Sequence, residues 1–125
     1  MNGIVAILED YRETLSPKEN INWEEFDQLI SPMINNPLPL FNFLKEGHNI
    51  NFLETIISLV IFTKNAEYDD RIQLIFSVFD DDGGGSLDRK EATKLVQSTI
   101  YGLAKLAGLT LPAKTVVQDY IHELF

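Results

Sequence analysis

Apolar residues recur at helical spacing through most of this chain, in short stretches that polar or glycine-containing segments separate. Apolar positions three and four residues apart are typical of amphipathic helices. The stretch 52–62 is apolar at almost every position, which predicts a helix buried on most sides. The pattern predicts an all-α protein with helices within residues 4–11, 26–30, 40–44, 52–62, 72–79, 95–103 and 117–125.

The same short signal precedes three of these helices. It consists of an apolar residue, then Asn or Asp, then two residues, then Glu. Asn or Asp can cap the helix start, and the Glu three residues later can accept a hydrogen bond from the backbone N–H of the cap, which completes a capping box. Each copy thus completes a helix-loop-helix unit, here called a hand. The copies are Ile21-Asn22 with Glu25, Ile50-Asn51 with Glu54, and Leu87-Asp88 with Glu91.

The loop of the third hand has the pattern of a calcium site. Residues 80–91 place carboxylates at positions 1, 3, 9 and 12 and a glycine, Gly85, at position 6, which is the calcium loop of an EF-hand. Calcium requires six to eight oxygen ligands, and magnesium could use the same site. The predicted ligands are Asp80, Asp82, Ser86 through its carbonyl, Asp88, and Glu91 with two oxygens.

Position 5 of this loop departs from the pattern. Gly84 stands where Asp, Asn or Ser is usual, so a water must supply that ligand. Three consecutive glycines, residues 83–85, also raise the entropy cost of ordering the loop. We therefore expect binding on the order of micromolar. The alternative is an ordinary polar turn, but the amphipathic stretches on both sides favour a metal loop.

The first two hands lack these acids and are predicted to be structural. Counting back twelve residues from Glu25 puts Thr14, Ser16 and Lys18 at positions 1, 3 and 5, and a lysine repels a cation. The second hand begins near Asn36 and Pro37 and has a loop about two residues short. Lys45 stands where its first acid should be. We expect no calcium in either loop.

Paired hands join their loops through a small antiparallel ribbon, which Ile21 and Ile50 should form. This pairing predicts an N-terminal lobe of residues 1–63 and a C-terminal lobe of residues 64–125. In the second lobe Leu87 has no local ribbon partner, so a homodimer that pairs two Leu87 strands is conceivable.

The last predicted helix has the spacing of a helix that enters another loop. A break between Gly108 and Pro112 should separate it from the helix before it. The chain stops where a fourth loop would begin, which predicts a truncated piece of a longer protein or a short natural variant. In the alternative, this helix only caps the hydrophobic face of hand three.

Composition narrows the function. The net charge of −9 disfavours nucleic acid and anionic membranes as partners. The chain has no cysteine, and neither a signal peptide, an N-myristoylation pattern nor a transmembrane stretch is recognisable, so we expect a cytoplasmic protein. No nucleophile, phosphate loop or catalytic metal motif surrounds His48 or His122, so no enzymatic activity is expected.

The segment 68–125, which includes the calcium loop, resembles the third hand of calcineurin B, the calcineurin B-like proteins and the neuronal calcium sensors. The paired hands that precede the catalytic part of calcium-activated NADPH oxidases are similar. The resemblance implies two lobes that share a hydrophobic groove, in which calcium changes helix angles and a target helix is gripped or released. Gly84 and the acid-free early loops depart from that pattern.

The leading hypothesis is a calcium-responsive regulatory domain that binds one ion and presents an apolar face to a dedicated protein target, an amphipathic helix or an enzyme domain. The alternatives are a calcium-independent docking scaffold in which the ion is a structural staple, a regulatory segment of a larger calcium-activated enzyme, and a passive buffer. Ordinary core packing competes with the groove role for each candidate. The candidate groove residues are Phe41, Phe52, Ile56, Leu59, Phe62, Phe76 and Ile100.

Overall fold

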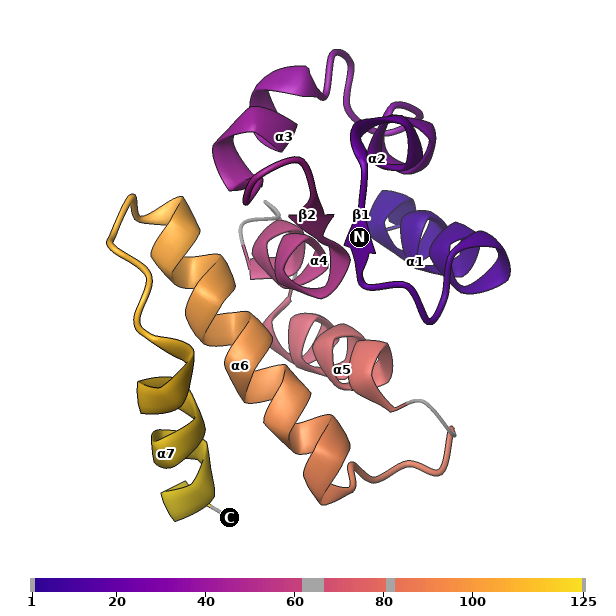
Figure 1. Ribbon diagram of the computed structural model, residues 1–125. Helices are drawn as coiled ribbons and strands as arrows, with labels where there is room; N and C mark the ends of the chain where they lie inside the picture. Colours follow the sequence, from indigo (N-terminus) through magenta and orange to yellow (C-terminus); the bar gives the residue numbers. More distant parts are fainter. Residues whose placement is uncertain (1, 62–66, 81–82, 125) are drawn as a thin grey trace.

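A computed structural model describes residues 2–61, 67–80 and 83–124 (Figure 1). Within these ranges the chain forms seven helices and two very short strands, so the predicted all-α class is confirmed. The arrangement is that of EF-hand helix-loop-helix units. The elements are α1 (Asn2–Thr14), β1 (Asn20–Ile21), α2 (Trp23–Ile30), α3 (Leu38–Leu44), β2 (Ile50–Asn51), α4 (Phe52–Ile61), α5 (Tyr68–Phe79), α6 (Arg89–Leu106) and α7 (Lys114–Leu124).

The loops of the first two hands meet in the predicted ribbon. Strands β1 and β2 are antiparallel, and Ile21 lies opposite Ile50. Both side chains are fully buried, which fixes the register because a slip by one residue would expose them. The ribbon thereby joins hand one to hand two.

Two of the three predicted capping boxes are present in full, at Asn22 with Glu25 and at Asp88 with Glu91. The third is only half formed. The Asn51 side chain accepts a hydrogen bond of 3.0 Å from the Glu54 N–H, but the Glu54 carboxylate forms an ion pair with Lys105. In hand two, α3 begins at Leu38, with Pro37 as its cap, rather than with Asn36 as the capping residue.

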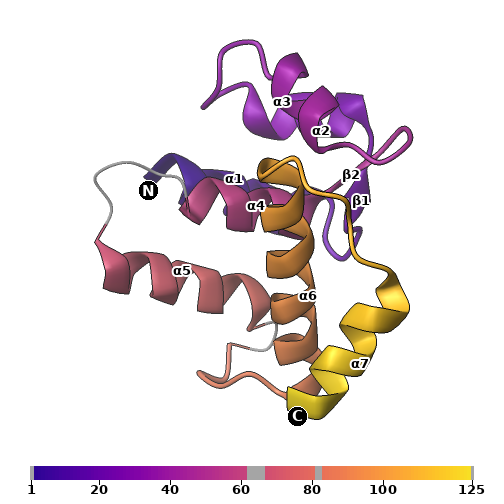
Figure 2. The same cartoon turned by 90° about the vertical axis from the view of Figure 1, so that its left-hand side faces the viewer.

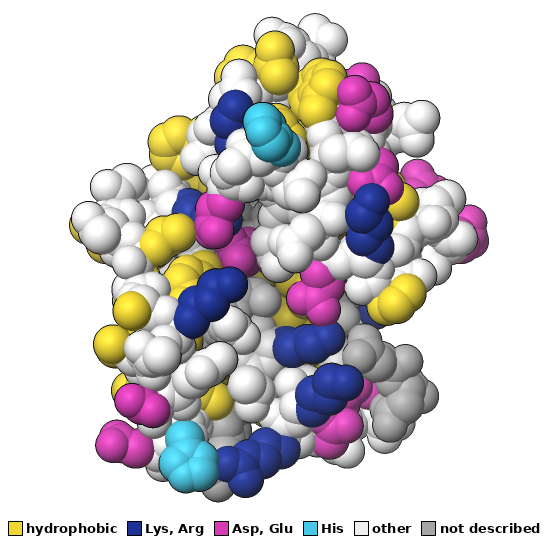
Figure 3. Space-filling view, viewed as in Figure 1, with side chains coloured by type: hydrophobic (Ala, Val, Ile, Leu, Met, Phe, Trp, Pro, Cys, Tyr) yellow, Lys and Arg dark blue, Asp and Glu magenta, His cyan; other side chains and the backbone are white. Residues whose placement is uncertain are grey.

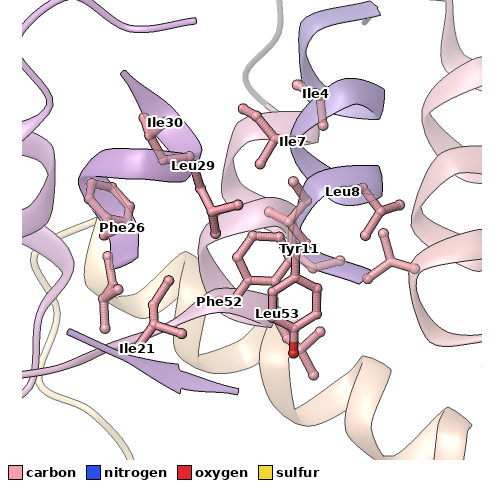
Figure 4. Close-up of a cluster of buried hydrophobic side chains, with 14 of the residues drawn as sticks. Ile4, Ile7, Leu8, Tyr11, Ile21, Phe26, Leu29, Ile30, Phe52 and Leu53 are labelled. Atoms are coloured by element: carbon pink, nitrogen blue, oxygen red, sulfur yellow. The ribbon is translucent and has the colours of Figure 1, made fainter. Parts of the chain in front are cut away.

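Helix α4 lies at the centre of the molecule and packs against α1, α5 and α6 (Figure 1). Its apolar side chains form the main core together with residues of both predicted lobes. The ring of Phe52 at its start stacks on Tyr11 of α1 at a centroid distance of 3.9 Å (Figure 4). Val78 and Phe79 of α5 belong to the same core. The two-lobe division stays a prediction, but its parts share one apolar interior.

The C-terminal part is organised around α6. Gly108 adopts a left-handed conformation (φ 69°) and ends the helix, as the sequence predicted. Helix α7 turns back alongside α6 (Figure 2), and Val117 and Ile121 form a second small core with Tyr101. Helix α7 therefore packs on α6 of hand three, and its role as the entering helix of a fourth hand or as a cap on hand three stays a prediction. Phe125 lies outside the described residues.

The faces of α5 and α6 differ from the expected ones. Ile72 and Leu103, apolar residues at the ends of the predicted helical stretches 72–79 and 95–103, are 47% and 39% exposed. The buried residues of α6 are mainly small or polar, namely Glu91, Ser98, Tyr101, Gly102 and Ala104. The reason is that α6 crosses α4 at close range, where small side chains fit. A β-carbon on Gly102 would lie 3.0 Å from the Glu54 carbonyl oxygen.

We expect Gly102→Ala to lower the free energy of unfolding by about 1–3 kcal/mol, because the added methyl group meets the backbone of α4. In an ordinary helix interior the same substitution raises stability by up to about 1 kcal/mol, so the sign is diagnostic. Urea denaturation followed by circular dichroism measures the effect. Lys90→Ala, at an exposed position of the same helix, is the matched control. A stabilised Gly102→Ala variant would contradict the close crossing.

Candidate functional site

The loop of hand three connects α5 to α6. Asp80, at loop position 1, ends α5, and its backbone N–H donates to the Phe76 carbonyl at 3.1 Å. Asp88, at position 9, caps α6. Gly85, at position 6, has a φ of 82°, which a residue with a β-carbon adopts only under strain. The predicted sharp turn is therefore present.

The Asp80 carboxylate is fixed in a way that suits a cation. Its Oδ2 accepts a hydrogen bond of 3.0 Å from the Gly85 N–H, which closes the turn. Its Oδ1 is buried and has no hydrogen-bond partner among the residues that the structure describes. A buried carboxylate oxygen without a partner is costly in free energy, and a bound cation would remove that cost. This oxygen is the strongest structural indication of a metal site in the loop.

The other predicted ligands are placed less directly. Glu91 is only 5% exposed, and its Oε1 accepts a hydrogen bond of 3.0 Å from the Asp88 N–H. Asp88 Oδ1 in turn accepts one of 2.8 Å from the Glu91 N–H. Ser86 is exposed, and Asp82 lies outside the described residues. Among the residues that the structure describes, no three His, Cys, Asp or Glu side chains converge as a ligand set, so the five-ligand site stays a prediction.

Hand one holds its last loop glutamate with a lysine. The Lys18 ammonium nitrogen lies 2.8 and 2.9 Å from the two carboxylate oxygens of Glu25. The hydrogen bond from Lys18, assisted by one from the Asn22 N–H, lowers the pKa of Glu25 below its ordinary value. The sequence indicated that Lys18 would repel a cation. The structure adds that Lys18 binds the carboxylate that a cation would otherwise use.

Hand two holds its last loop glutamate with a lysine from another hand. Lys105 of α6 lies 2.6 Å from Glu54 Oε1 and 2.8 Å from Glu46 Oε1. Burial raises the pKa of Glu54, and Lys105 opposes that rise. No sequence signal indicated Lys105, because the contact depends on the crossing of α6 over α4.

These residues border a polar hollow of about 380 Å³ between the loop of hand two and α6. Its charged lining consists of Glu19, Glu46, Glu54, Lys94, Lys105 and Lys114. Lys94 and Glu19 form a further ion pair of 2.7 Å across it. Acidic and basic side chains are accordingly intermingled on this face of the molecule (Figure 3). The hollow therefore has little net charge.

The candidate groove residues fall into three groups. Phe41, Phe52 and Ile56 are buried in the core and, in this arrangement, have no surface to offer a partner. Leu59, Phe76 and Ile100 are partly buried, and Phe62 lies outside the described residues. An open apolar hollow of about 620 Å³ lies instead near the end of α6. Its larger lining residues are Ile100, Leu103, Leu106, Leu109 and Pro112.

Comparison with known proteins finds a distant partial relative. Over 78 residues the chain is 31% identical to the type 2 calcineurin B subunit of Dictyostelium discoideum. The match covers 59% of this chain and 42% of that protein, so the chain spans less than half of its relative's length. No family model and no solved structure matches. The similarity agrees with the EF-hand architecture described above.

None of the helices within residues 2–61, 67–80 and 83–124 is both long and apolar enough to cross a membrane.

We expect Lys18→Met to raise the pKa of Glu25 toward the ordinary value of 4.5, which a carboxyl-detected NMR titration measures. The folded-state pKa of Glu25 is lowered, so the pair stabilises the protein above pH 4.5 and this contribution is lost as the pH falls through the lowered pKa. For a pair this exposed the contribution is only about 0.2–1 kcal/mol. Lys45→Met, in the neighbouring loop, is the control. An unchanged Glu25 pKa would show that the pair is absent in solution.

Proposed function

We propose that this chain is a calcium-binding regulatory domain of the EF-hand family that binds one ion in the loop of hand three. The observation that carries the proposal is the buried Oδ1 of Asp80 at position 1 of that loop, which has no partner within residues 2–61, 67–80 and 83–124. The turn at Gly85 supports the proposal, because the Gly85 N–H donates to the Asp80 carboxylate and the loop therefore curls around that carboxylate. The residues that would hold the ion are Asp80, Asp82, Ser86, Asp88 and Glu91, with a water at Gly84.

Glu91 is the switch residue in this proposal. A bound calcium ion supplies a divalent charge that attracts six to eight oxygens, magnesium being a weaker fit to a flexible loop. To turn its carboxylate toward the loop, Glu91 must give up the hydrogen bond from the Asp88 N–H. Because Glu91 lies in the first turn of α6, this rearrangement moves the start of that helix. The packing of α6 on α4 and α5 then carries the movement into the core.

The partner we propose is a protein. The relative found by comparison is by name a subunit, which supports a role within an assembly of the calcineurin B kind. The apolar hollow at the end of α6 would receive apolar side chains of an amphipathic helix or enzyme domain, together with residues released from the half-buried set Leu59, Phe76 and Ile100. This role is regulatory rather than catalytic, and we place it in the cytoplasm.

A second candidate function is a calcium-independent docking scaffold. Its specific support is that hands one and two are already closed by lysine ammonium groups, at Glu25 and Glu54. In that case the ion in hand three is a staple, or the domain belongs to a larger calcium-activated enzyme. A homodimer through Leu87 is less well supported, because Leu87 is partly buried against the main core.

Calorimetric titration with calcium tests the leading proposal. The intact chain should bind one ion with a dissociation constant on the order of micromolar, and Glu91→Gln should lose binding because one of the two ligand oxygens is replaced by an amide. Glu123→Gln, at an exposed position of α7, is the control. Proton-nitrogen spectra recorded in parallel should shift along α6. Absence of binding at millimolar calcium sinks the sensor, whereas binding without spectral change identifies a staple.

A gain-of-function variant tests the ligand geometry. Gly84→Asp supplies the oxygen missing at position 5, so we expect calcium affinity to rise by roughly tenfold, since ligand charge tunes affinity in these loops. Gly84→Ala is the matched control because it makes the same backbone change without a ligand. Equal affinities for the two variants would mean that position 5 does not face the ion.

A further inference from the structure

Hands one and two lack the acidic residues of a calcium loop, except for the glutamate at the last loop position. In both hands a lysine ammonium group contacts that glutamate. In hand one the ammonium group comes from Lys18, within the same loop. In hand two it comes from Lys105, about fifty residues further along the chain. In a calcium-binding loop this glutamate gives both oxygens to the ion. In hand one, in hand two and in a calcium-binding loop, a positive charge therefore contacts the glutamate at the last loop position. In hand two that charge belongs to a residue of a distant helix.

The surroundings of Lys105 are those of a buried cation site. Its side chain is 7% exposed, and that of Glu54 is 14% exposed. The carboxylates that contact its ammonium group come from opposite ends of the loop of hand two, Glu46 from the beginning and Glu54 from the last position. A buried charge of this kind is tolerated only while its partner is present, because either one alone would be left without compensation in the interior.

The backbone at this place is arranged around the ion pair. Gly102, one turn before Lys105, brings α6 so close to α4 that a β-carbon would lie 3.0 Å from the Glu54 carbonyl oxygen. The same carbonyl accepts a hydrogen bond of 2.8 Å from the Ser58 hydroxyl. The close approach of the two helices thus lies one turn of α6 from the ion pair between Lys105 and Glu54.

We propose that Lys105 is a permanent, built-in cation of hand two, which joins the loop of that hand to α6 of hand three whether or not calcium is bound. Hand two would then keep a fixed conformation, and the second half of α6 would be fixed with it. This inference does not depend on calcium binding by hand three.

The experiment measures unfolding by urea in the presence of a calcium chelator, for the intact chain and three variants. Lys105→Met keeps the length of the side chain and removes the charge, so the folding equilibrium constant should fall about 100-fold or more. Lys90→Met makes the same change at an exposed position of α6 and should alter the constant by less than about threefold. Lys105→Met combined with Glu54→Met replaces both charges and should recover at least about tenfold over Lys105→Met alone.

Two results would overturn the proposal. One is a Lys105→Met variant no less stable than Lys90→Met. The other is a double variant as unstable as Lys105→Met, which would mean that packing rather than charge explains the loss. If Lys105→Met does not fold at all, the double variant tests the proposal instead. A folded double variant would support the ion pair, and an unfolded double variant would contradict it. Because chelator is present throughout, failure of the calcium proposal would leave these outcomes unchanged.

Discussion

The burial of α4 is the constraint on which the rest of the structure depends. Ile56, Ile57 and Val60 have no exposed surface, and even the polar residues Thr55 and Ser58 are buried. Their hydroxyl groups donate to carbonyl oxygens one turn earlier, so both buried hydroxyl groups are hydrogen-bonded. A helix of this composition must be covered on most sides to keep its apolar surface from water, at about 25 cal/mol for each Å². Helices α1 of hand one and α5 and α6 of hand three provide that cover.

Each hand engages its last loop glutamate within the folded chain. Glu25 and Glu54 each have a lysine ammonium group within hydrogen-bonding distance. Glu91 accepts from the Asp88 N–H, in a loop that adds the carboxylates of Asp80 and Asp88. Hands one and two thus place a lysine ammonium group at this glutamate. The acids of residues 80–91, which match the pattern of a calcium loop, are the reason why we propose calcium for hand three.

Features that depend on local chemistry could be predicted from the sequence. The capping boxes at Asn22 and Asp88 follow from residues three positions apart, and the ribbon between Ile21 and Ile50 follows from the repeat of the same short signal in two hands. The half-formed box at Glu54 could not be foreseen, because its carboxylate is drawn away by a lysine distant in sequence. For the same reason the small and polar buried face of α6 was missed, since helical periodicity records where apolar residues lie and not which neighbour crosses at close range.

In the candidate site, the turn at Gly85 was predictable because only glycine adopts that conformation without strain. The burial of Asp80 Oδ1, without a partner in the described part of the chain, was not, because burial of a single oxygen depends on how the loop packs. That Gly84 leaves one ligand to water was predicted from its position alone and stays a prediction. The convergence of the ligands remains a prediction, since Asp82 lies outside the described residues.

In the two proposals taken together, one end of α6 is fixed and the other end can move. Glu91 and Lys105 are fourteen residues apart, or about 21 Å along the helix axis. If the Lys105 end is held by hand two and the Glu91 end moves with the calcium loop, α6 must tilt about its crossing with α4 near Gly102. A shift of about 1 Å at Glu91 then corresponds to a tilt of only a few degrees over the roughly 16 Å between Glu91 and Gly102. Side chains before the crossing, such as Leu95, would move most, whereas the apolar hollow beyond it would move least. A calcium-dependent partner that occupies the hollow should therefore also contact side chains before the crossing, because the hollow alone would change least.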